Sequence, residues 1–166
     1  LLLITVIFKK PLKEFGLQPG DWKKGWKTVL FLLPVFILAG YLGAGDPEMQ
    51  AEYPLAGSHM TNVWIFIGVE LCYLIYYLRW EFFFRGYMQF GLEKRFGYTA
   101  AILIQTIPSA IVHIGKPAAE SFGAIFAGIV FGYIAYKTRS FIYPMILHAG
   151  IGISTFFSVS NQRSTL

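Results

Sequence analysis

Charged side chains are scarce in this chain. Only 14% of its 166 residues are Asp, Glu, Lys or Arg, whereas a soluble domain carries about a quarter. Apolar residues make up 55%, and the mean hydropathy is +0.54. So little polar surface cannot face water on all sides, which excludes an ordinary soluble domain. We therefore expect a membrane protein in contact with the lipid bilayer, whose aromatic residues pack against lipid and its interfaces.

Cysteine and the common metal motifs are also lacking. Cys72 is the only cysteine, so the chain cannot form an internal disulfide, and its redox compartment stays undetermined. Neither HExxH nor CxxCH occurs, which are the patterns of zinc peptidase helices and of haem attachment. The net charge of +5 does not indicate nucleic acid, because the basic residues cluster at the ends of apolar runs.

Long apolar runs dominate the rest of the sequence. They predict membrane-spanning helices at 28–43, 61–79, 99–115, 121–136 and 141–159. The opening residues LLLITVIF, followed by two lysines, are typical of the end of one more helix. The fold class is therefore all-α, a polytopic bundle of about five spans plus a truncated N-terminal one. We expect residues 1–166 to form a single membrane-embedded domain.

Charge in the loops predicts how the spans are threaded. The basic stretches fall on one side of the membrane, at 9–27, 94–95 and 137–139. The loop at 45–60 contains three acidic residues and no lysine or arginine. By the positive-inside rule this loop lies on the opposite, external side. His59 lies in this loop, and we assign it no role.

Four ionisable residues lie within apolar runs, where each is costly and is therefore a functional candidate: Glu81, Arg85, His113 and His148. Glu81 and Arg85 are four residues apart, which places them on one helical face as a favourable pair. The pair is either a structural link between helices or a carboxylate whose position and pKa the arginine sets.

The two histidines fall on later runs. Gly97 lies midway in sequence between Glu81 and His113, so a tight turn there would bring the two to the same depth, facing each other. His148 is followed by Ala149, Gly150 and Gly152, whose small side chains leave room for a helix or a substrate. The alternatives are an interfacial His113 and a core His148 with its hydrogen bonds satisfied.

Two further carboxylates are weaker candidates. Glu120 is expected to begin a helix, where a capping role is favoured. Glu70 lies in the middle of a run, three turns before Glu81 and on nearly the same face. It could line the same cavity.

The order Glu81-Phe-Phe-Phe-Arg85-Gly86, then His113, then His148 resembles the CPBP family of intramembrane proteases. This is the type II CAAX prenyl endopeptidase and bacteriocin-processing (Abi) family, and the resemblance covers about residues 62–155. It implies an endopeptidase of a prokaryotic cell membrane, acting on a membrane-associated peptide or protein and not on nucleic acid. A glutamate would activate water, while the histidines polarise that water and the carbonyl. This implies Glu81, Arg85, His113 and His148 as the catalytic set.

Cofactor requirements stay open under this resemblance. Members of the family are labelled metalloproteases, but a metal-free glutamate mechanism is also proposed. The sequence requires no cofactor. Zinc would be held by Glu81, His113 and His148. A redox carrier with two histidine ligands to haem is a third class of function, but it would not explain Glu81 beside Arg85.

The sequence departs from the family pattern at three positions. The pattern has two adjacent glutamates, a phenylalanine four residues before the first histidine, and an Asn or Asp four residues after the second. Here these positions hold Trp80, Ser109 and Gly152. Either Glu81 takes the role of base, or Glu120 or Glu70 supplies it, or hydrolysis is lost. In the last case the protein is an inactive relative acting as a membrane scaffold, immunity or maturation factor.

Overall fold

The computed structural model describes residues 9–53 and 62–164, which form helices and turns without any strand. The predicted N-terminal helix end at residues 1–8 lies outside the described residues, as does His59. In chain order the elements are η2 (Leu12–Phe15), α1 (Trp22–Gly43), α2 (Pro47–Glu52), α3 (Val63–Glu81), the π-helical η3 (Phe82–Phe90), α4 (Gly91–Ile111), α5 (Ala118–Thr138) and α6 (Ile142–Ser164).

The chain is a helical membrane protein, as predicted, although the number of spans differs. Among the described residues, four helices are long and apolar enough to cross a membrane: Trp22–Gly43, Val63–Ile111, Ala118–Thr138 and Ile142–Gln162. The sequence suggested about five. The difference arises because α3, η3 and α4 follow one another without a break over 49 residues.

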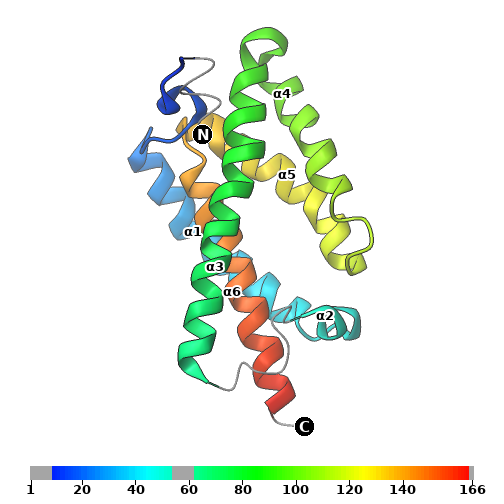
Figure 1. Ribbon diagram of the computed structural model, residues 1–166. Coiled ribbons are helices and arrows are strands. Elements are labelled where there is room, and N and C mark those ends of the chain that lie inside the picture. The colour runs from blue at the N-terminus through cyan, green and yellow to red at the C-terminus, as the bar shows by residue number, and fades with distance from the viewer. Residues whose placement is uncertain (1–8, 54–61, 165–166) are drawn as a thin grey trace.

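Within that stretch the chain reverses direction. Gly97 adopts φ 77° and ψ 166°, a backbone conformation that a residue with a Cβ rarely adopts. Figure 1 shows α3 running the length of the molecule before the ribbon turns back into α4. The part of α4 after Gly97 ends at Ile111, which at 1.5 Å per residue covers about 21 Å, less than the ~30 Å of a hydrocarbon core.

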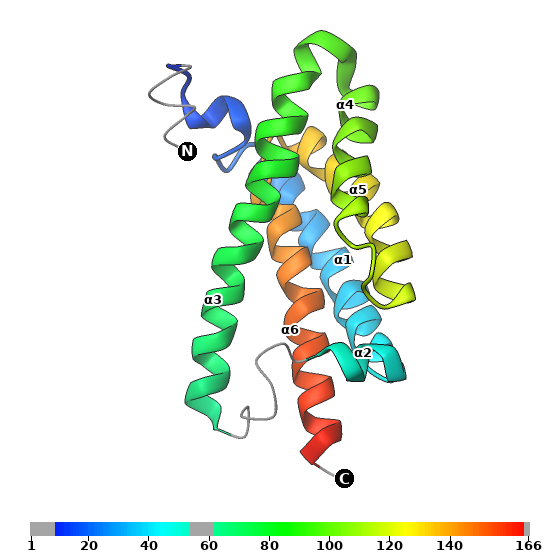
Figure 2. The ribbon, with the colours of Figure 1, turned by 45° about the vertical axis from the view of Figure 1, so that its right-hand side comes forward.

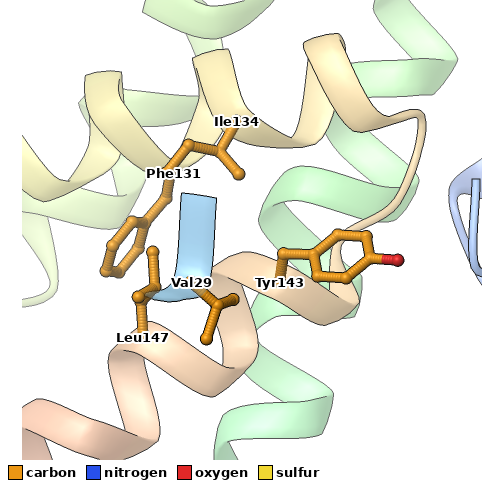
Figure 3. Close-up of a cluster of buried hydrophobic side chains, with 5 residues drawn as sticks. All are labelled: Val29, Phe131, Ile134, Tyr143 and Leu147. Atoms are coloured by element: carbon orange, nitrogen blue, oxygen red, sulfur yellow. The ribbon is translucent and has the colours of Figure 1, made fainter. Parts of the chain in front are cut away.

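The helices pack in two contacting groups. Helix α6 lies along α1 and against α3, while α4 lies beside α5 (Figure 2). Five buried side chains from α1, α5 and α6 form the hydrophobic core where these groups meet (Figure 3): Val29, Phe131, Ile134, Tyr143 and Leu147. Leu147 is fully buried and directly precedes His148, so the core fixes the part of α6 that carries this histidine.

Polar contacts join the loops at each end of the bundle. Three contacts place the three basic stretches at one end, as the threading predicted. They are Lys94–Glu14 at 3.5 Å, Arg139–Glu93 at 2.7 Å and Gln18 Nε2 to the Arg139 carbonyl at 3.1 Å. Three more join the acidic α2 segment to the start of α5: Glu52–Lys116, Glu48 with the Ala118 amide, and Glu120 with Tyr53.

Candidate active site

A buried carboxylate, guanidinium and imidazole meet where α3 ends. Glu81 is the last residue of α3 and is completely buried; Arg85 follows one turn later on η3 and is almost completely buried. Arg85 Nη1 lies 3.2 Å from Glu81 Oε1. His148 of α6 places its Nδ1 2.7 Å from the same oxygen. The predicted pairing of Glu81 with Arg85 is therefore present, and His148 joins it across 67 residues of sequence.

The hydrogen bond to Glu81 fixes the tautomer of neutral His148. A carboxylate can only accept, so Nδ1 carries the proton and donates it, which leaves the lone pair on Nε2. The His148 side chain is 22% exposed, whereas Glu81 is 0% exposed. The accessible basic atom of this group is thus an imidazole nitrogen, oriented by a carboxylate behind it.

Aromatic rings enclose Arg85. Its guanidinium carbon lies 5.9 Å from the Phe84 ring centroid and 5.6 Å from that of Phe131. Arg85 Nε and Nη1 and Glu81 Oε2 are buried and have no hydrogen-bond partner among the described residues. A charge desolvated this far depends strongly on its one ionic partner. The cost of removing either partner is therefore high.

His113 belongs to a second group of polar side chains. It lies in the turn after α4, where its Nδ1 donates to the Ser109 carbonyl at 2.7 Å. Its Nε2 lies 3.9 Å from Glu120 Oε1, and Glu120 Oε2 accepts a hydrogen bond from Tyr53 at 2.7 Å. Within the described part of the chain, His113 makes no hydrogen bond or ion pair with Glu81. The structure thus records no direct polar contact between the two residues.

The reason lies in the segment that joins them. Equal counts on either side of Gly97 give equal depths only if both arms are regular α-helices. The arm after Glu81 instead begins with nine π-helical residues, whose i→i+5 bonding changes both rise and rotation per residue. The other arm ends at Ile111, two residues before His113.

Trp80 contacts both imidazoles. Its ring centroid lies 5.4 Å from that of His113 and 6.5 Å from that of His148, and both contacts are edge-on. Trp80 occupies the position at which the family pattern has its first glutamate. The indole therefore stands where a second carboxylate would otherwise approach the two histidines.

The two additional carboxylates have different surroundings. Glu120 does lie in the first turn of α5, but it binds Tyr53 and faces His113, whereas Glu48 accepts from the first amide of α5. Glu120 therefore lies at the positive end of the α5 dipole, as predicted, while Glu48 bonds the first amide of that helix. Glu70 is buried, and neither of its carboxylate oxygens has a hydrogen-bond partner among the described residues. No contact joins it to the other candidates in this part of the chain.

Sequence reasoning did not single out Tyr77, which lies one turn before Glu81. Its ring packs on His148 with centroids 4.8 Å apart, and it is buried. The i, i+4 spacing to Glu81 was the available signal. The burial of Tyr77 and its close approach to Gly152 became visible only in the structure.

The proposed zinc ligands do not form a metal site. Across residues 9–53 and 62–164, no three His, Cys, Asp or Glu side chains come close enough together to hold an ion. Glu81 and His148 are adjacent, but His113 lies with Glu120 instead. The donor set does not fit zinc, and we derive no step through a metal.

A hollow on the surface lies away from these groups. It has a volume of about 340 Å³, and Lys13, Glu14, Gln18 and Arg139 are among its lining residues. It is at the basic end of the bundle, and none of the candidate residues lines it. Size alone therefore does not identify the site; the converging ionisable groups do.

A comparison with protein families matches the part of the chain that carries the candidate residues. The family described as type II CAAX prenyl endopeptidase Rce1-like matches residues 62–154, from the N-cap of α3 to the part of α6 just beyond Gly152. The match thus contains every candidate residue except Tyr53. No match was found among curated proteins or among solved structures. The match covers more than half of the chain. The chain is therefore an integral membrane protein that belongs to the Rce1-like family of type II CAAX prenyl endopeptidases.

Proposed function

We propose that the protein is an intramembrane endopeptidase in which His148, oriented by Glu81, activates the water that cleaves a peptide bond. The observation that carries this proposal is the 2.7 Å contact from His148 Nδ1 to the buried Glu81 carboxylate. It leaves Nε2 of a partly exposed histidine free to accept a proton. Family membership supports a peptide or protein as the substrate.

The reaction requires one proton relay. His148 Nε2 takes a proton from water as the water oxygen attacks the carbonyl carbon, and the carbonyl π electrons move to the oxygen. When this tetrahedral intermediate collapses, the C–N bond breaks and His148 returns the proton to the departing nitrogen. The products are a carboxylic acid and an amine. Glu81 keeps its hydrogen bond to Nδ1 throughout and stabilises the imidazolium.

This assignment makes Glu81 a positioning residue rather than the base. The carboxylate is completely buried, and one of its oxygens already faces both Arg85 and His148. Glu81 has no exposed surface, whereas part of the His148 side chain is exposed. His113 would contact the substrate from the other side of Trp80 and polarise its carbonyl, with Glu120 beside it.

The test is a cleavage assay on purified protein in liposomes. A panel of quenched fluorescent peptides would include a prenylated CAAX tail and unprenylated membrane peptides. We expect His148→Ala to lower kcat by about 10³-fold or more, and Glu81→Gln by about 10²–10⁴-fold. Exposed Tyr133→Phe on α5 is the control. Thermal unfolding of each variant separates lost chemistry from lost structure. Wild-type rates in a folded His148→Ala variant would rule out the mechanism.

A second candidate is a proteolytically silent relative that binds membrane peptides as a scaffold, immunity or maturation factor. The position of Trp80 favours it, because an indole contacts both histidines where the family pattern has a carboxylate. This candidate predicts that the wild type binds peptides of the panel but cleaves none of them. It also predicts that His148→Ala leaves peptide binding unchanged.

A further inference from the structure

Tyr77 and Gly152 fit together at the interface of α3 and α6. A Cβ built on Gly152 would lie 1.7 Å from the Tyr77 hydroxyl oxygen and 2.6 Å from Cζ. No side chain other than hydrogen can therefore occupy position 152 while Tyr77 is in place. The hydroxyl fills the space into which a residue at 152 would project.

The ring that carries this hydroxyl lies against the histidine assigned as base. Gly152 follows His148 by four residues on α6, so both are on the same helical face. The Tyr77 ring packs on the imidazole at 4.8 Å between centroids. The two elements thus present a phenol O–H and an imidazole nitrogen to the same region.

The hydroxyl has no hydrogen-bond partner among the described residues, although the Tyr77 side chain is only 6% exposed. A buried tyrosine usually places its O–H against an acceptor. An unused donor next to a reactive group is what an enzyme needs where negative charge develops.

We propose that Tyr77 donates a hydrogen bond to the carbonyl oxygen of the scissile peptide and stabilises the oxyanion that forms there. This inference rests on the proposed endopeptidase function. When His148 removes the proton from water and the carbonyl π electrons move to oxygen, the Tyr77 O–H faces that oxygen and keeps its own proton. The polar group that the family pattern supplies from position 152 is thus supplied from α3, and Gly152 makes room for it.

The first experiment removes only the hydroxyl. Tyr77→Phe keeps the ring that packs on His148, and Tyr73→Phe is the matched control one turn earlier on α3. With the peptide from the panel that is cleaved fastest, we expect Tyr77→Phe to lower kcat by about 10²–10³-fold. KM should change by less than about threefold, and Tyr73→Phe should match the wild type. An unchanged kcat in Tyr77→Phe, with His148→Ala inactive, overturns this inference and leaves the proposed function standing.

A second readout does not depend on turnover. A phosphinic peptide carries two oxygens on a tetrahedral centre and imitates the intermediate. We expect Tyr77→Phe to weaken its binding by about 10-fold or more while the affinity for the uncleaved substrate peptide stays the same, since only the intermediate carries the charged oxygen. An equal change for both ligands would overturn the inference.

A third experiment moves the donor to the other helix. Tyr77→Leu removes the phenol and opens the space over position 152, so Gly152→Asn can be added to it. We expect the double variant to recover at least about 10-fold in kcat over Tyr77→Leu alone, because an amide then donates from α6. Equal activity of the two folded proteins would count against a hydrogen-bond donor at this place.

Discussion

Gly152→Ala offers the sharpest test of how α3 and α6 are packed. The added methyl group would lie 1.7 Å from the Tyr77 hydroxyl, and ordinary contact begins at 3.4 Å. The hydroxyl must therefore move by about 1.7 Å, the difference between these distances. That movement is resisted by His148, whose ring contacts the Tyr77 ring.

The expected change in stability follows from two opposing effects. Replacing glycine by alanine within a helix is favourable by about 1 kcal/mol. Overpacking of a well-filled interface costs about 1–3 kcal/mol. We therefore expect the free energy of unfolding to fall by up to about 2 kcal/mol, measured by denaturant titration in detergent micelles. Adding Tyr77→Leu should remove the clash, giving a favourable coupling of about 1–3 kcal/mol in a double-mutant cycle.

The controls are other helical glycines. Gly68 on α3 and Gly123 on α5 have no atom within 4 Å of a built Cβ. Alanine at either position should leave stability unchanged or raise it by about 1 kcal/mol. If Gly152→Ala were as stable as these controls and showed no coupling to Tyr77→Leu, the packing of Tyr77 over Gly152 would be refuted.

Three further predictions concern the groups around the site. Arg85→Met should lower the free energy of unfolding by about 3–5 kcal/mol because it removes the guanidinium that pairs with the buried Glu81 carboxylate, whereas exposed Arg79→Met should change it by less than about 0.5 kcal/mol. Trp80→Glu, which places a carboxylate where the indole contacts both histidines, should raise the cleavage rate at least about 10-fold in the peptide assay. Tyr53→Phe removes the donor to Glu120 and should cost about 1 kcal/mol of stability.

The effect of Tyr53 on stability also has a defined pH dependence. Burial, and then the hydrogen bond to Glu120, raise the pKa of Tyr53 above its ordinary value of 10.0. A raised pKa in the folded state adds stability that is fully present below 10 and is lost only as pH rises through the higher folded-state value. The difference in unfolding free energy between wild type and Tyr53→Phe should therefore be constant between about pH 6 and 9.

Each of these predictions has a contrary result. Equal losses for Arg85→Met and Arg79→Met would show that the Glu81–Arg85 pair does not stabilise the fold. A Trp80→Glu protein that folds and cleaves no faster than the wild type would show that the indole does not slow catalysis. A Tyr53→Phe difference that vanished below pH 9 would mean that the phenol does not donate to Glu120.

The sequence predicted the local features of the site well. Glu81 and Arg85 pair as their i, i+4 spacing requires, and the reversal falls at Gly97 because glycine tolerates the positive φ found there. The contacts of His113 were not predictable in the same way. They depend on the π-helical η3 and on Tyr53 in a distant segment, and no short-range pattern encodes either.

By itself, the sequence determined that this is a helical membrane protein of the Rce1-like family, since low charge, long apolar runs and the order of Glu81, Arg85, His113 and His148 are all readable along the chain. The tertiary structure alone decided that His148 meets Glu81 while His113 meets Glu120, and that Tyr77 lies over Gly152. The physical reason is that helices apolar on every side carry no mark of which face turns inward. Their rotation and register are set only when the side chains of different helices interlock.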